Sequence, residues 1–381
     1  MRDNPALPYW RLSAFYFVYF ASLGVIMPYW GLYLKAQGYS PQAIGELVAV
    51  IMSTKIISPY LLGWIADHTG RGMLIVRYTS VLTMLGFVGV FFADDFWTLV
   101  LVSVVFSFFW NAVLPQFEVA TMNYLEGRSY QYSAIRLWGS LGFIIAVVGI
   151  GEGLRHVDED LVPVVIMGLF SAIVLAGLSV PERPAVAHTN SQQSISQILA
   201  QPVVVAILVV FFLLQLSHGP YYTFYTIYLE SQGYSSSLIG WLWALGVIAE
   251  IGVFLLMQHL FLAIGPRLLL LMALLLAAGR WLIIGFFVET LPALLFAQLL
   301  HAASFGVCHA VAIFLIHRHF TGQFQGRGQA LYASLSFGVG GAMGSLGSGY
   351  LWEAYPPVLS FAAAAVAAML AFLVAWRYVR L

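Results

Sequence analysis

The sequence has few charged residues and only one cysteine. Asp, Glu, Lys and Arg make up 8% of its 381 residues, whereas a soluble domain carries about 25%, so a water-soluble globular protein is excluded. The single Cys308 excludes an internal disulfide. A formal net charge of zero gives no electrostatic basis for binding nucleic acid. Because Walker, haem and catalytic-triad motifs are absent, we expect no enzyme activity, no cofactor and no metal.

Apolar residues are abundant instead. They make up 61% of the chain, with a mean hydropathy of +0.89. Apolar runs of about 20 residues recur throughout, each long enough to cross a bilayer as a helix, and the alternation typical of a barrel is absent. We predict an all-α membrane protein with twelve transmembrane helices, at roughly 10–34, 42–66, 73–93, 96–123, 132–152, 160–180, 202–229, 236–258, 265–286, 291–316, 327–350 and 356–377.

The chain repeats itself. LYLKAQGYSPQAIG at 32–45 returns as IYLESQGYSSSLIG at 227–240, and a polar segment separates the sixth and seventh runs. We therefore predict an N-terminal six-helix bundle (1–180), a cytoplasmic linker (181–200) and a C-terminal six-helix bundle (201–381). Parallel repeats of this kind are typical of secondary transporters that alternate access to a central site. Repeated halves also occur in channels.

Basic residues indicate the orientation. With the N-terminus in the cytoplasm, only Lys35 and Arg155 fall outside, and the outer loops are acidic. The positive-inside rule therefore predicts a multi-pass inner-membrane protein with both termini cytoplasmic. The arginines predicted on the cytoplasmic side are Arg2, Arg11, Arg71, Arg77, Arg128, Arg183, Arg267, Arg318, Arg327, Arg377 and Arg380.

The loop GWIADHTGRG at 63–72 carries a motif. Gly63 allows close helix approach, Asp67 can accept hydrogen bonds from a helix N-terminus, and Gly70 with Arg71 makes a tight basic turn. The segment resembles the cytoplasmic loop motif of the major facilitator superfamily, although His68 and Gly72 depart from it. The resemblance implies that these residues control gating.

Several charged residues lie inside predicted spans. Lys55 and Glu250 occupy equivalent places in the two repeats, with opposite charge. Since a charge in the membrane is costly, each should face a polar cavity or a partner. The remaining ionisable residues singled out within the spans are Glu118, Arg136, Arg280 and His301.

Glu118 and Arg136 are eighteen residues apart, and Arg136 lies in the segment IRLWGSLGF at 135–143. This resembles lactose permease and its oligosaccharide–proton symporter relatives, which implies that Glu118 and Arg136 bind substrate. By the same resemblance Glu250, Arg280 and His301 would couple substrate to protons. The family's coupling carboxylate follows the histidine by three residues, but Ser304 occupies that position here.

A second resemblance extends over both halves. The segments RLWGS (136–140), QGYSSSLIGWLWALGVIAE (232–250), GRW (279–281) and LLHAASFGVCH (299–309) are similar to the phenylpropionate permease branch of the superfamily. It implies a substrate with an aromatic ring and a carboxylate.

The charges within the spans also favour an acidic substrate. Lys55, Arg136 and Arg280 exceed Glu118 and Glu250 by one positive charge, and an unpaired charge in a low-dielectric cavity is costly until an anion binds. Arginine forks suit a carboxylate. His218, Tyr222 and Tyr225 share one face of the seventh helix, where Gly219-Pro220 can open it locally. The predicted substrate-binding set is Lys55, Glu118, Arg136, Asn111, Trp110, His218, Tyr222 and Tyr225.

We therefore expect a monomeric, proton-coupled symporter of a small aromatic or organic acid, with Glu250 as the principal proton carrier. A symporter of neutral sugars or nucleosides is the main alternative, favoured by the spacing of Glu118 and Arg136. The alternatives from other classes are a membrane-embedded enzyme or receptor, and a channel. The repeat argues against an enzyme or receptor.

Overall fold

A computed structural model describes the chain apart from residues 1–6, 126–127, 129–130, 184–195 and 381. Arg2 and most of the predicted linker 181–200 lie outside the described residues. Helices account for the secondary structure of the described part, and no strand occurs there. This agrees with the predicted fold class.

Six membrane-length helical segments form the first half. They are α1 (Tyr9–Ala36), α2 (Pro41–Ser53) continued by η1 (Thr54–Ile56) and α3 (Ser58–Thr69), α4 (Gly72–Val88) continued by η2 (Gly89–Phe92), α5 (Phe96–Tyr124), α6 (Tyr132–Gly153) and α7 (Leu161–Ser179). All six are long and apolar enough to cross a membrane. They match the predicted spans to within a few residues.

The second half begins with the short α8 (Ser196–Leu199). Its membrane-length segments are α9 (Pro202–Ser217) with α10 (Gly219–Ser231), α11 (Ser236–Ala263), α12 (Pro266–Phe286), α13 (Leu291–Leu299) with η4 (Ala302–Val307) and α14 (Cys308–His319), α15 (Gln325–Ala333) with η6 (Ser334–Gly340) and α16 (Gly341–Ala354), and α17 (Pro357–Tyr378). The one-turn η5 (Gly322–Phe324) precedes α15.

Eleven segments in the described part meet the length and hydropathy needed for a membrane span, and Gln325–Ala354 is not among them. The remaining predicted span, 327–350, is also helical in the structure, as Gln325–Ala354, but it falls short of this hydropathy. It is rich in glycine and serine because it packs against other helices. A side chain at Gly344 would meet the Leu216 carbonyl oxygen at 2.4 Å, and one at Gly340 the Phe212 oxygen at 2.7 Å. Small residues permit such close packing.

The repeated QGYS sequences build the same turn twice. Gly38 and Gly233 have φ angles of +84° and +82°, a left-handed conformation that favours glycine at a helix C-terminus. Ser40 and Ser235 then accept hydrogen bonds from the backbone N–H groups of Ala43 and Leu238, each at 3.3 Å. Each repeat therefore ends one helix and starts the next.

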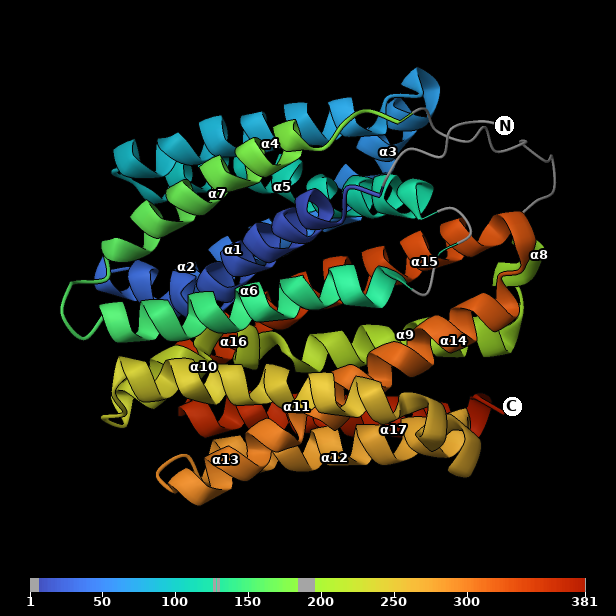
Figure 1. Ribbon diagram of the computed structural model, residues 1–381. Helices are drawn as coiled ribbons and strands as arrows, with labels where there is room; N and C mark the ends of the chain where they lie inside the picture. Colours follow the sequence, from blue (N-terminus) through green and yellow to red (C-terminus); the bar gives the residue numbers. More distant parts are fainter. Residues whose placement is uncertain (1–6, 126–127, 129–130, 184–195, 381) are drawn as a thin grey trace.

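The two six-helix bundles meet mainly at one end. Figure 1 shows the first half largely above the second. We name the end that holds Tyr9 and Tyr378 the terminal end, and the other the opposite end. The principal contacts between halves pair α2 with α16, α6 with α11 and α1 with α10.

Close backbone approaches place these contacts at the opposite end. A side chain at Gly45 would meet the Gly349 Cα at 2.7 Å, and one at Gly151 would meet the Ser236 carbonyl oxygen at 2.6 Å. At the terminal end, α3 and α15 make their principal contacts within their own halves. The halves are therefore closed together at the opposite end.

Candidate functional site

Irregular backbone interrupts four spans near their middle. The second span tightens into the 3-10 turn η1, and the seventh breaks at His218 between α9 and α10. The tenth and eleventh spans widen into π-helical segments, η4 and η6. Such interruptions expose backbone and redirect side chains, and they are frequent at functional sites.

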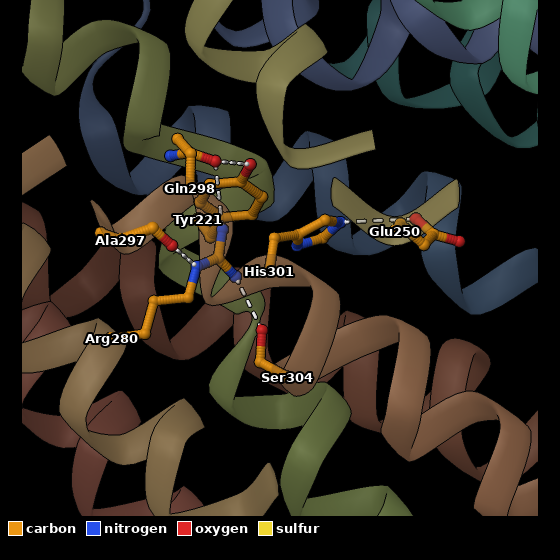
Figure 2. A network of polar contacts seen from close by, with 7 residues as sticks. All are labelled: Tyr221, Glu250, Arg280, Ala297, Gln298, His301 and Ser304. Carbon is orange, nitrogen blue, oxygen red and sulfur yellow. Dashed lines mark hydrogen bonds and ion pairs between the residues drawn. The ribbon is translucent and has the colours of Figure 1, made fainter. Parts of the chain in front are cut away.

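Arg280 on α12 is the centre of a buried polar network (Figure 2). Its side chain is 0% exposed. Its Nε donates to the Ala297 carbonyl oxygen at 3.0 Å, one terminal nitrogen to the Ser304 Oγ at 3.1 Å, and the other to the Gln298 Oε1 at 3.5 Å. The guanidinium is thus fixed by the tenth span.

Aromatic faces complete the surroundings of this cation. The Arg280 guanidinium carbon lies 4.2 Å from the Tyr221 ring centroid and 4.6 Å from that of Trp281, which is cation–π geometry. No carboxylate lies within ion-pair distance of it among the described residues. Ser304, which replaces the carboxylate of the sugar-symporter pattern, supplies a neutral hydroxyl. Within the described part of the chain, the partners of the Arg280 side chain are therefore neutral groups.

Gln298 connects the network to the seventh span. It is 0% exposed, its Nε2 donates to the Tyr225 hydroxyl at 2.6 Å, and its Oε1 accepts from the Tyr221 hydroxyl at 3.0 Å. Every polar atom of this amide is occupied, so Gln298 holds Arg280 and two tyrosines in a fixed relation.

Glu250 is near His301 and not in contact with Arg280. The Glu250 Oε2 lies 3.8 Å from the His301 Nε2 (Figure 2). The Arg280 guanidinium is instead enclosed by Ala297, Gln298 and Ser304. His301 is 7% exposed, and its Nδ1 has no hydrogen-bond partner.

Lys55 lies on η1, where the second span is broken. Its Nζ contacts the Met52 Sδ at 3.7 Å, and no carboxylate lies within ion-pair distance of it in the described part of the chain. Asn111 on α5 supports the break, because its Nδ2 donates to the Ile51 carbonyl oxygen at 2.9 Å and to the Thr54 Oγ1 at 2.8 Å. Its amide nitrogen is thus used by the second span.

Arg136 and Glu118 are neighbours without a direct ion pair. The Arg136 guanidinium carbon lies 3.7 Å from the Phe20 ring centroid and 5.8 Å from that of Tyr16, which packs edge-on against Tyr132. Glu118 Oε1 accepts a hydrogen bond from the Tyr132 hydroxyl at 3.3 Å. Neither hydrogen bond nor ion pair occupies the guanidinium of Arg136 among the described residues, so its donors are available.

Three predicted aromatic or imidazole residues are buried. Trp110 is 1% exposed, and His218 is fully buried with its Nδ1 2.8 Å from the Leu214 carbonyl oxygen. Among the described residues, neither the Trp110 Nε1 nor the His218 Nε2 has a hydrogen-bond partner. Tyr225 is bound to Gln298, whereas Tyr222 is half-buried and stacks on His218 at 5.5 Å. Of the predicted face of the seventh helix, only Tyr222 is partly accessible.

The loop motif forms a turn at the terminal end. Gly70 has a φ of +64°, a side chain at Gly63 would lie 3.0 Å from the Gln116 Nε2, and Arg71 directly precedes α4. Asp67 lines a small cavity between α3 and α5. We expected it to accept from a helix N-terminus, but Glu182 does so instead, accepting from the Met73 backbone N–H at 3.1 Å.

Four residues of the site are not among those predicted from the sequence. They are Trp281, Gln298, Phe305 and also Tyr221, which packs against Arg280. Gln298 gave a usable signal, since it is an amide in an apolar run three residues before His301. Phe305, four residues after His301, stacks on it with ring centroids 5.4 Å apart. The aromatics gave no separate signal because the chain is 15% aromatic.

Several known proteins are similar to this chain in sequence. The MFS_1 like family matches residues 9–363. The chain is 30% identical over 352 residues to an Escherichia coli (strain K12) protein named "Probable 3-phenylpropionic acid transporter", covering 90% of each. It is 26% identical over 348 residues to the maltose permease of Geobacillus stearothermophilus, covering 89% of this chain and 86% of that one.

Solved structures agree in fold. A mutant of the nucleoside transporter NupG superposes with a TM-score of 0.85 at 15% identity, covering 97% of this chain and 98% of that one. A bacterial homologue of the human lysosomal transporter Spinster, in an inward-facing and unoccupied conformation, gives 0.76 at 13% identity, covering 100% and 98%.

The family match and the sequence similarity to transporters define this chain as a membrane transporter rather than an enzyme. The chain belongs to the MFS_1 like family of the major facilitator superfamily.

Proposed function

We propose that this protein imports a small aromatic or organic acid together with protons, by alternating access across the inner membrane. One observation carries the proposal. Lys55, Arg136 and Arg280 all lie within membrane spans, and none has a carboxylate within ion-pair distance in the described part of the chain.

An anionic substrate would offset this excess of positive charge. A charge left unpaired in a low-dielectric site is costly, so a carboxylate is favoured more than a neutral ligand. Arg280 is fully buried and already bonded, so it contributes mainly through its field. Arg136 and Lys55 are half-buried, and their donors can reach a ligand. We therefore assign the direct contacts with the carboxylate to these two residues.

The proton would travel on Glu250. Its carboxyl is beside His301, and Arg136 of the other half lies at the same depth, because α6 and α11 pack antiparallel with Gly151 beside Ser236 and Val147 beside Gly240. A substrate carboxylate bound to Arg136 would neutralise a positive charge at this depth and so favour the protonated form of Glu250. Proton and substrate occupancy are linked in this way, without the carboxylate that Ser304 replaces.

Alternating access follows from the two halves, 1–180 and 201–381, rocking about the site. The positive-inside rule assigns the terminal end to the cytoplasm, with both chain termini there. Closure at the opposite end then corresponds to an inward-facing state, and the loop with Gly63, Asp67, Gly70 and Arg71 would act when the terminal end closes. A single chain holds the whole site, so a monomer suffices.

Binding measurements on Lys55→Ala and Arg136→Ala test the proposal. Since a hydrogen bond to a charged group contributes about 1.5–3 kcal/mol, each variant should bind 3-phenylpropionate about 10- to 100-fold more weakly. Arg155→Ala is the control, because it removes an exposed positive charge outside the membrane site. Unchanged affinity in both site variants would refute the role of these cations.

A neutral sugar or nucleoside is the second candidate, and the contact between Tyr132 and Glu118 favours it. A carboxylate that accepts hydrogen bonds beside an arginine suits a ligand hydroxyl. Thermal stabilisation of the purified protein by maltose or a nucleoside, with no response to aromatic acids, would select this candidate over the acid.

A further inference from the structure

Three rings on the tenth span form a stacked column. His301 and Phe305 have centroids 5.4 Å apart with planes inclined by 10°, and Phe305 and His309 are 6.0 Å apart at 4°. The three residues follow at intervals of four in the sequence. The Glu250 carboxylate lies at one end of the column, and the Tyr332 hydroxyl lies 3.3 Å from the His309 Nδ1 at the other.

The π-helical segment η4 explains why these rings align. In a regular α-helix, residues four apart are rotated by about 40° because 3.6 residues make a turn. The wider π turn across Ala302–Val307 reduces this rotation, since it adds backbone to each turn. The backbone irregularity thus lines up an aromatic surface.

The column is partly open in the middle. Phe305 and His309 are half-buried, and Phe337 from η6 stands edge-on to both, at 6.4 and 6.3 Å. A ligand ring can meet the same edges and faces, because aromatic pairs favour edge-to-face or offset contacts with centroids 4.5–7 Å apart.

A cation from the other half lies at the depth of this surface. Helices α6 and α11 pack antiparallel, with Gly151 beside Ser236 and Val147 beside Gly240, so the register continues to Arg136 at the level of Glu250. Arg136 has Phe20 against one face, so its donors point along the plane of the guanidinium. Since Glu250 lies beside His301 at one end of the column, the packing of α6 on α11 brings an available carboxylate anchor of one half to the depth of an aromatic surface of the other.

We propose that Phe305, with Phe337, is the subsite for the aromatic ring of the substrate, while Arg136 binds its carboxylate. This assignment rests on the proposed transport of an acid and makes it specific to aryl acids. Because the two groups belong to different halves, an aryl acid links the halves, and an acid without a ring contacts only one of them.

Two ligands of nearly equal size separate the role of the ring from that of the acid. The affinities of the purified full-length chain for 3-phenylpropionate and 3-cyclohexylpropionate are compared by titration calorimetry. Phe305→Leu keeps an apolar side chain but removes the aromatic contact. We expect it to weaken phenylpropionate binding about 3- to 10-fold and to change cyclohexylpropionate binding less than twofold.

Phe314→Leu is the matched control, since Phe314 lies on the same span and packs against Phe261; it should change neither affinity. Phe337→Leu provides a second variant if Phe305→Leu does not fold, with the same expected selectivity. Equal effects on both ligands, or none, would overturn the aromatic subsite while acid transport stands. Binding of neither acid by the unaltered protein would overturn the proposed function and this subsite together.

Discussion

Lys35 and Glu230 form an ion pair that joins the two halves at the opposite end. The Lys35 Nζ lies 2.5 Å from the Glu230 Oε2, and the residues are 195 positions apart. They are therefore equivalent positions of the repeat, at the end of α1 and of α10. The duplication has placed opposite charges at one structural position, and the pair holds the repeats together.

Removing this pair should shift the population towards the state open at the opposite end. Both side chains are about 40% exposed (43% and 41%), and an exposed pair contributes about 0–1 kcal/mol, so Lys35→Ala should change the ratio of states up to about fivefold. The measurement is the spin-label distance between cysteines introduced at Gln37 and Gln232, with Cys308→Ser as background.

The double variant Lys35→Glu with Glu230→Lys should restore the original distance distribution. Arg155→Ala is the control, because its ion pair with Glu152 lies within one half and should leave the distribution unchanged. If the control shifts the distribution as much as Lys35→Ala does, the ion pair has no specific role in closure.

Gly45 is a second determinant of closure. Its Cα faces Gly349 of the other half, and an added Cβ would lie 2.7 Å from the Gly349 Cα. Because backbone atoms of both helices meet here, neither can yield to an added methyl group. Gly45→Ala should therefore push α2 away from α16 and lengthen the Gln37–Gln232 distance. We expect transport in proteoliposomes to fall at least tenfold.

Gly149→Ala is the matched change, because nothing lies within 4 Å of its added Cβ, and it should retain transport. Closure would not depend on the Gly45 contact if Gly45→Ala kept both the parental distance and the parental rate.

Gln298→Ala should lower the stability of the second half. The change leaves Tyr221, Tyr225 and Arg280 without a hydrogen bond each. Arg280 keeps its two other hydrogen bonds, so the two tyrosine hydroxyls dominate the loss. Since each buried group left unsatisfied costs about 1–3 kcal/mol, we expect a total of about 2–6 kcal/mol and a clear fall in the unfolding temperature of the purified protein. Gln201→Ala, at an exposed position, should leave it unchanged; equal unfolding temperatures for both variants would contradict the network.

Asn111 should act by positioning Lys55. Asn111→Ala removes the bonds to Ile51 and Thr54 that support η1, so Lys55 loses its fixed place. We expect 3-phenylpropionate affinity to fall about 5- to 10-fold, consistent with one weakened charge-assisted contact. Adding Lys55→Ala to this variant should lower the affinity little further, because both substitutions act on the same contact.

The comparison variant for this cycle is Asn123→Ala, at a cavity of the terminal end, which should combine additively with Lys55→Ala. Additive losses for Asn111→Ala and Lys55→Ala would instead assign Asn111 an independent contact with substrate.

Glu250→Gln should separate exchange from accumulation. The amide imitates the protonated carboxyl, so exchange of substrate at equal concentrations should continue in proteoliposomes while accumulation driven by a proton gradient is lost. Normal accumulation by Glu250→Gln with failure of His301→Gln would move the proton to the histidine. Loss of exchange as well would make Glu250 a binding or structural residue.

Much of the fold followed from the sequence because bilayer thickness fixes helix length and the requirement for apolar residues. The turns were equally local: Gly38 with Ser40, and Gly233 with Ser235, end one helix and begin the next through their own backbone conformations and hydroxyls. The span Gln325–Ala354 departs from the hydropathy pattern because its close backbone contacts with α9 and α2 require small residues such as glycine and serine, which are less apolar than leucine or valine.

The ionisable residues of the candidate site were also visible in the sequence, since charges within apolar runs are costly and therefore conspicuous. Their partners were decided only by tertiary structure. Arg280 is bound by Ala297, Gln298 and Ser304, and Glu250 is beside His301, because the rotation of each helix about its axis and its crossing with neighbours set which side chains meet. Sequence spacing describes one helix at a time, whereas these contacts depend on how several helices pack.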